Sequence, residues 1–218
     1  MMQKLKRYFW AATAAAGLTL VPGALAGEAD IAIPPLDKVQ FGGLGGIHGT
    51  TLMYLGLVIC LIGAIFGLVQ YFQTKALPVH SSMAQVSETI WETCKTYLFT
   101  QGKFLAILWV LIAACMVYYF VGLQHKGLGD VALILVCSIF GILGSYGVAW
   151  FGIRINTVSN SRTSFSALKG NPFATLGIPL RSGMSVGLLL VAVELFFMIC
   201  ILIFLPRDLA GPCFIGFA

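Results

Sequence analysis

The chain consists of long apolar runs separated by shorter segments that hold most of its charged residues. Four runs reach the length of about 20 residues that a helix needs to cross the hydrocarbon of a bilayer. They cover residues 52–70, 104–122, 131–152 and 184–205. Because backbone polar groups must be paired inside lipid, each run predicts a transmembrane helix. The pattern therefore predicts an all-α, polytopic helical membrane protein.

Helical periodicity continues outside the second and third runs. After Pro78, Ser82 and Gln85 predict a capping box, and apolar residues then recur at helical spacing into the second run, at Met83, Val86, Ile90, Cys94 and Tyr97 or Leu98. The third run continues on a similar period until it meets a stop signal, formed by Gly170, Asn171 and Pro172. Both patterns predict helices that extend beyond the membrane on the same side. The alternative is a pair of amphipathic helices that lie flat on its surface.

The composition of the chain supports a membrane protein. Hydrophobic residues make up 59% of the sequence and charged residues only 10%, whereas an ordinary soluble chain carries about 25% charged residues. This shortage leaves too little polar surface to cover a soluble core. Soluble, disordered, collagen-like and coiled-coil classes are therefore excluded.

The first residues contain the three regions of a secretory signal. Lys4, Lys6 and Arg7 precede an apolar run, and Ala24 and Ala26 match the small-residue pattern of a signal peptidase site. We therefore predict a signal peptide over residues 1–26. Glycines and prolines then predict an irregular extracytoplasmic lead-in over residues 27–49. An uncleaved membrane anchor is the alternative interpretation of the first segment.

The distribution of basic residues predicts the same orientation. Two connections, 71–103 and 153–182, carry Lys75, Lys95, Lys103, Arg154, Arg162, Lys169 and Arg181, whereas the segments on the opposite side carry Lys38, Lys126 and Arg207. Basic connections remain in the cytoplasm. We therefore predict a multi-pass protein of the inner membrane, with cytoplasmic helix extensions and an extracytoplasmic N-terminus.

Glu194 is the only acidic or basic residue well inside a predicted span. An ionisable group at that depth costs several kcal/mol unless it is paired or hydrated. Glu194 is thus a candidate for a site on an ion pathway. The alternative is a protonated or hydrogen-bonded glutamate that packs against further helices.

Arginine, amide and hydroxyl groups are concentrated just beyond the third span. Arg154, Asn156, Asn160 and Arg162 fall in this segment. Such groups suit either a phosphate-bearing ligand or a hydrogen-bonded helix bundle. We favour the bundle, because orientation alone requires arginine at a cytoplasmic helix end. On the neighbouring extension, Glu88, Glu92 and Lys95 predict a solvated ion pair.

Small residues predict close contacts between helices. Gly63 with Gly67, and Gly183 with Gly187, have GxxxG spacing, and three more glycines share one face of the third span, Gly141, Gly144 and Gly147. The six cysteines show no CxxC spacing and the three histidines are scattered over three loops, so neither a disulfide framework nor a metal site is predicted. The nucleotide-binding and metalloprotease motifs GxGxxG, P-loop and HExxH are absent from the sequence. No nucleic-acid partner is predicted.

The segment after the fourth span predicts that the sequence continues beyond residue 218. Residues 206–212 predict a turn on the outer side, and residues 213–218 begin an apolar run that is too short to cross a bilayer. We therefore expect an N-terminal fragment of a larger polytopic protein, with residues 50–218 forming its transmembrane portion.

Several stretches together resemble one family. They are residues 92–98 with 101–104, 144–157 continued by 160–163, 178–185, and 211–218. In combination they resemble the N-terminal part of bacterial membrane-bound, ion-translocating inorganic pyrophosphatases, over about residues 50–218. The resemblance implies a homodimeric, all-helical enzyme that hydrolyses magnesium pyrophosphate in a cytoplasmic funnel. It also implies outward translocation of a proton or sodium ion.

The resemblance assigns no catalytic, cofactor-binding or metal residue to this sequence. The family's metal, pyrophosphate and gating motifs lie on later helices, so the fragment alone is expected to be inactive. Glu194 does not match the helix that holds the family's gating carboxylate. For Arg154, Asn156, Asn160 and Arg162 we expect a role in ordering the cytoplasmic head. Proton or sodium specificity and potassium dependence are left open.

Two other functional classes fit the same residues. One is a small multipass scaffold or assembly subunit that packs its glycine faces against a partner. The other is a fragment of a proton-coupled secondary transporter that uses Glu194 as its proton site. A continuation of the reading frame would favour the pump.

Overall fold

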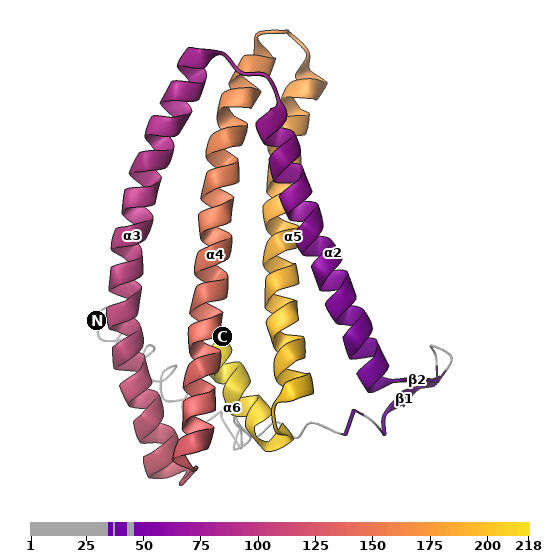
Figure 1. Cartoon of the computed structure of the whole chain (residues 1–218), viewed down its shortest axis with the longest axis vertical. Helices are drawn as coiled ribbons and strands as arrows, with labels where there is room; N and C mark the ends of the chain where they lie inside the picture. The colour runs from indigo at the N-terminus through magenta and orange to yellow at the C-terminus, as the bar shows by residue number, and fades with distance from the viewer. Residues whose placement is uncertain (1–34, 37, 43–45) are drawn as a thin grey trace, which may run out of the picture.

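The computed structural model describes residues 35–36, 38–42 and 46–218. The predicted signal peptide, residues 1–26, lies outside the described residues. Two short strands, β1 (Gln40–Phe41) and β2 (Ile47–His48), precede the helices. The helices are α2 (Gly49–Ala76), α3 (Ser81–Val117) with its π-helical continuation η3 (Tyr118–Leu123), α4 (Leu128–Ala167), α5 (Pro172–Phe204) and α6 (Arg207–Phe217) (Figure 1).

Four of these helices are long and apolar enough to cross a membrane. They are α2, α3 with η3, α4 and α5, and each contains one of the four predicted spans. Large apolar side chains cover much of their outer surfaces, such as Ile62, Ile107 and Val110. This exposure is expected for helices that face lipid. The predicted polytopic, all-α fold is confirmed.

Two helices continue beyond their predicted spans toward the same end of the molecule. Helix α3 begins at Ser81, well before the span at 104–122, and α4 continues to Ala167 after the span at 131–152. Both extensions lie at the top of Figure 1, where α2 ends and α5 begins. Each extension is continuous with its span, so the alternative of separate helices lying flat on the membrane is wrong.

Helix α5 also has an extension, which the sequence pattern did not reveal. Asn171 caps the helix by accepting hydrogen bonds from the backbone N–H groups of Phe173 and Ala174, and Pro172 occupies the first turn. These are the usual residues for a helix start. Pro179 lies inside the helix. It has no N–H to donate to the carbonyl one turn earlier, and this break made the segment look like a connection.

Three local predictions are wrong. Helix α3 is capped by His80, whose Nδ1 accepts a hydrogen bond from the Ser82 N–H at 3.3 Å, so Ser82 and Gln85 form no capping box. The described part of the lead-in is not wholly irregular, since it contains the antiparallel β1–β2 pair. Residues 207–212 form the first half of α6 and not a turn, since burial of Leu209 and Cys213 against α4 favours a helix there.

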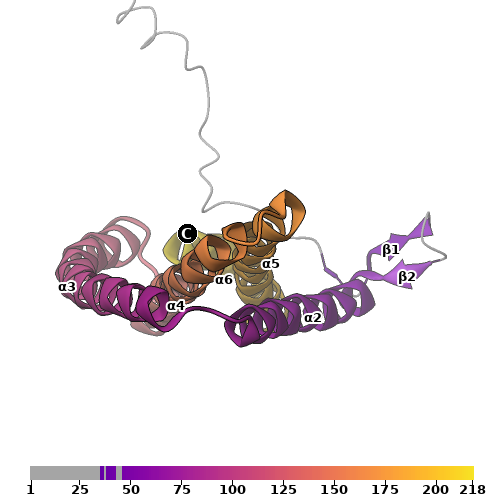
Figure 2. The same ribbon diagram turned by 90° about the horizontal axis from the view of Figure 1, so that it is seen from above.

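Helix α4 is the central element of the bundle. It lies between α3 and α5, and α2 lies beside α5 (Figure 2). Helix α6 folds back against α4 and contributes to the larger apolar core, which is formed by Phe120, Val131, Ile134, Cys137, Ile201, Leu209, Ala210 and Cys213. A smaller core joins α2 to α5 through Cys60, Ala192 and Ile199. The extended ends of the helices are therefore held together through α4 and α5.

Candidate functional site

The extensions of α3 and α4 are joined by polar contacts near Arg154. The guanidinium of Arg154 donates a hydrogen bond to Glu88 Oε2 at 3.1 Å and lies 4.8 Å from the ring centroid of Trp91. Farther along the same interface, the Ser87 hydroxyl donates to the carbonyl of Thr157 at 2.6 Å. Arg154 thus binds both a carboxylate and an aromatic face of α3.

Arg162 joins α4 to the end of α2. Its guanidinium donates to the carbonyls of Lys75 and Val158, at 3.1 and 3.2 Å, and to the Ser161 hydroxyl at 3.1 Å. Lys75 lies in the last turn of α2, where carbonyl groups have no partner within the helix. Burial lowers the pKa of Arg162, and repulsion from Arg154 adds to this effect. The arginine nevertheless stays charged, because a guanidinium is not deprotonated in proteins.

The two asparagines of the predicted cluster lie elsewhere on α4. Asn156 and Asn160 are both exposed. Neither side chain forms a hydrogen bond with another described residue, although the carbonyl of Asn160 accepts one from the Ser164 hydroxyl. The structure therefore brings the two arginines into contacts between helices and leaves the two asparagines on the surface.

Glu194 lies on the membrane-spanning part of α5 beside a small cavity of about 120 Å³. Gly141, Gly144 and Ser145 of α4 line the other side of this cavity. The glutamate is exposed and forms no hydrogen bond or ion pair with the described part of the chain. The partner that its depth requires is not among these residues.

The other candidate residues are ion-paired carboxylates and free cysteines. Lys95 and Glu92 form the predicted exposed ion pair at 2.6 Å, whereas Glu88 binds Arg154. The six cysteines are free thiols. Across residues 46–218 and the short described stretches before them, no group of three or more His, Cys, Asp or Glu could hold a metal ion. The described geometry is therefore that of a helix scaffold with a polar, extended end.

Aromatic residues at the α3–α4 interface were missed by the motif analysis. The Trp150 ring lies 5.5 Å from Trp91 and 5.4 Å from Phe99, measured between centroids. The Tyr146 hydroxyl donates to the carbonyl of Leu98 at 2.8 Å. Trp91 and Phe99 are about two helical turns apart, so both fall on one face of α3. That spacing is the signal that could have identified them.

Comparison with known proteins gives one family. Residues 61–218 match the family model described as inorganic H+ pyrophosphatase. A K(+)-insensitive pyrophosphate-energized proton pump of Chlorobaculum tepidum is 62% identical over 163 residues, which cover 75% of this chain and 22% of that protein. A pump of the same description from Pyrobaculum aerophilum is 28% identical over 163 residues, covering 72% of this chain and 22% of the pump.

The chain thus spans about 22% of the length of the curated relatives that it matches. No solved structure gave a significant match.

Proposed function

This chain belongs to the inorganic H+ pyrophosphatase family, and we propose that it forms part of a membrane pump that hydrolyses pyrophosphate and moves protons outward. The observation that carries this proposal is the 62% identity to a named proton pump over 163 residues. Neither the scaffold subunit nor the secondary transporter receives comparable support.

Within such a pump, the four helices act as a brace for the cytoplasmic head. Arg154 fixes the α3 extension to α4, and Arg162 fixes the end of α2 to α4. A charged side chain that makes hydrogen bonds to a neighbouring helix fixes the position of one helix relative to the other. Asn156 and Asn160, which are exposed on the same extension, face further helices of the pump.

Magnesium is the metal that pyrophosphate hydrolysis implies. Metal ions and basic side chains neutralise the phosphate charge in reactions of this class. The donors in the described part of this chain do not fit such a site, because they form no cluster of three or more acidic, histidine or cysteine ligands. Magnesium and pyrophosphate are therefore assigned to other segments of the pump, and the chain alone is expected to be inactive.

The orientation and assembly of the pump are part of the same proposal. The basic connections lie in the cytoplasm, which puts the N-terminus outside and the extended helix ends inside. The translocated ion is a proton and not sodium, in keeping with the names of both relatives. The pump is a homodimer, as the family resemblance implies.

A chimera tests the proposal. The segment of the Chlorobaculum tepidum pump that aligns with this chain would be replaced by the corresponding segment of this chain. Inside-out membrane vesicles would then be assayed in sodium-free buffer for acidification after addition of pyrophosphate and magnesium. We expect acidification that a protonophore abolishes, because 62% identity preserves the helix contacts within the segment. Vesicles that contain only the present chain are the control and should not acidify.

Two outcomes would contradict parts of this proposal. A chimera that inserts at normal levels but neither hydrolyses pyrophosphate nor acidifies the vesicles would contradict the assignment to a pump. Replacement of Glu194 by Gln in the chimera addresses the ion pathway separately. Retained acidification is expected for a packing role, whereas retained hydrolysis without acidification would make Glu194 part of the proton path.

A further inference from the structure

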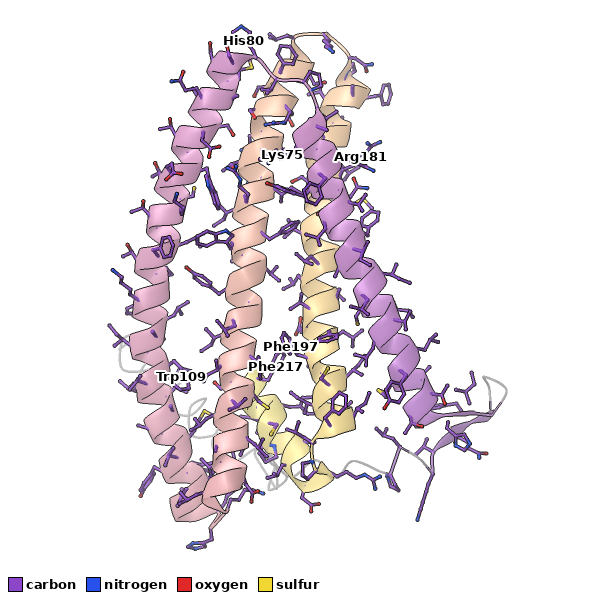
Figure 3. The ribbon with its side chains drawn as sticks, viewed as in Figure 1. Lys75, His80, Trp109, Arg181, Phe197 and Phe217 are labelled. Carbon is purple, nitrogen blue, oxygen red and sulfur yellow. The ribbon has the colours of Figure 1, made fainter. Side chains whose placement is uncertain are left out.

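A basic cavity of about 450 Å³ lies where the ends of α2, α4 and α5 meet. Arg162, Lys169 and Arg181 line it, and no aspartate or glutamate does. Lys75, in the last turn of α2, and Arg181 of α5 are both labelled at this end of the bundle in Figure 3. The three lining cations come from α4, from the turn that follows it and from α5, so the positive charge results from the fold and not from a single basic run.

Two buried polar atoms in the lining have no protein partner. They are Nε of Arg162 and Oε1 of Gln70. The other two nitrogens of Arg162 make three hydrogen bonds to carbonyl and hydroxyl groups. Because a guanidinium has five N–H donors, the Nε–H and one further N–H are left unused. A buried polar group without a partner costs about 1–3 kcal/mol. The cavity therefore offers a fixed donor and an amide to a bound ligand.

Apolar side chains form much of the remaining lining. They include Leu77, Phe165, Phe173 and Ile178. A small inorganic anion would leave this apolar surface unused, whereas a ligand with both an anionic group and a hydrocarbon part would contact both kinds of surface. The volume falls in the range of roughly 300–1,000 Å³ that is usual for small-molecule sites.

The predicted span limits place one side of the basic cavity at the level of the membrane surface. Gln70 is the last residue of the apolar run 52–70, and Arg181 precedes the run 184–205 by a few residues. Phe173 and Ala174 belong to the first turn of α5, whose N-terminal end carries partial positive charge. Lipid head groups occupy this depth on either side of a bilayer.

We propose that the basic cavity binds the phosphate head group of an anionic phospholipid. Arg162 and Arg181 donate to the phosphate oxygens, Lys169 adds charge, and Gln70 hydrogen-bonds the glycerol or head-group hydroxyls. The acyl chains follow the apolar side of the cavity into the bilayer. Basic pockets between transmembrane helices are known to recognise anionic lipids in this way.

Competition between lipids tests the assignment on the intact protein. The purified protein in detergent would be mixed with equimolar phosphatidylglycerol and phosphatidylcholine with identical acyl chains, and bound lipid would be counted by native mass spectrometry. We expect a clear preference for phosphatidylglycerol. The double variant K169Q/R181Q should reduce that preference by roughly tenfold, because each basic group near an anionic head group contributes a several-fold factor.

A matched variant controls for the loss of charge. K103Q/K126Q removes two lysines that do not line the basic cavity and should keep the wild-type preference. K169R/R181K retains both charges and should also keep it. Circular dichroism checks that all variants keep their helices. Lys169 and Arg181 are suitable positions for substitution, because both side chains are exposed.

Three outcomes would overturn the proposal. One is an equal preference for phosphatidylglycerol in K169Q/R181Q and K103Q/K126Q. Another is no preference in the wild-type protein. The third is a rise in melting temperature with millimolar inorganic phosphate that K169Q/R181Q abolishes, without any preference between the two lipids. That last result would make the occupant a free phosphate anion and not a lipid.

Discussion

Helices α2 and α5 approach each other through small residues, whereas α3 is held against α4 by aromatic rings and side-chain hydrogen bonds. At the first interface a Cβ on Gly63 would lie 3.2 Å from that of Ala192, and the Ser185 hydroxyl donates to the carbonyl of Gly67 at 2.8 Å. At the second, Trp150 lies between Trp91 and Phe99.

The two interfaces are therefore sensitive to opposite changes. Close backbone approach is lost when atoms are added to a small residue. Contacts between large side chains are lost when atoms are removed. The α2–α5 interface should tolerate truncation better than enlargement, and the α3–α4 interface should show the reverse.

Enlarging Gly67 should have the greatest effect. A Cβ at this position would already lie 3.2 Å from the carbonyl oxygen of Ser185, so Gly67→Leu must separate the two helices. We expect a loss of about 3 kcal/mol, measured by thermal unfolding in detergent. Gly183→Leu is the control, because no atom lies within 4 Å of a Cβ there. Equal losses in the two variants would show that the small-residue contact does not hold the interface.

Truncating Trp150 should have a somewhat smaller effect. The half-buried ring contacts Trp91 and Phe99, and Trp150→Ala removes both contacts at once. We expect a loss of about 2 kcal/mol in the same assay, below the value for fully buried tryptophans. Phe104→Ala, on an exposed part of α3, should change stability little. If W150A were as stable as F104A, the aromatic contact would contribute nothing to the joining of α3 to α4.

Removing the Tyr146 hydroxyl should weaken the α3–α4 interface near Leu98. Tyr146→Phe leaves the ring in place and deletes the hydrogen bond to the Leu98 carbonyl. The expected loss is about 1 kcal/mol. Tyr97→Phe provides the comparison, since this hydroxyl is exposed and bonds to no other described residue. Indistinguishable melting temperatures for the two variants would show that the Tyr146 hydrogen bond contributes nothing to holding α3 against α4.

Neutralising Glu88 should have the smallest effect. Glu88→Gln breaks its ion pair with Arg154, in which the two side chains are 57% and 24% exposed. Solvent screening limits the loss to about 0.5 kcal/mol, and high salt should reduce it further. Glu92→Gln, which breaks an ion pair within α3, serves as the reference. A loss above that of Y146F would mean that charge, and not bulk, dominates this interface.

The lengths of the apolar runs and the residues at the turns were sufficient to predict the four long helices and one of the junctions between them. Each run of about 20 apolar residues became a helix, because no other structure satisfies its backbone in lipid. The junction between α4 and α5 was also predictable, since Gly170 has the positive φ of 69° that favours glycine and Asn171 caps the next helix.

Partners across the bundle could not be predicted from the sequence. Gly63 with Gly67 and Gly183 with Gly187 have the same spacing, yet only the first pair contacts a neighbouring helix. Spacing places residues on one face but does not say what covers that face. Within the α4 face, Gly141 and Gly144 make contacts, whereas Gly147 does not.

At the candidate site, the sequence identified the interacting residues but not the residues that they contact. Arg154 and Arg162 were identified from a polar segment beyond a span, but their partners, Glu88 and the carbonyl of Lys75, come from segments far away in the chain. The His80 cap replaced the expected serine cap for a related reason, since several neighbouring side chains could accept the same N–H.

The interior proline of α5 has a mechanical consequence. Pro179 leaves one carbonyl of the preceding turn without its helical hydrogen bond, so bending at this position costs less than elsewhere in the helix. Ser182 and Ser185, which follow it, are buried, and Ser185 is fixed to α2. The segment before Pro179 can therefore tilt as a hinged arm while the membrane-spanning segment stays in place.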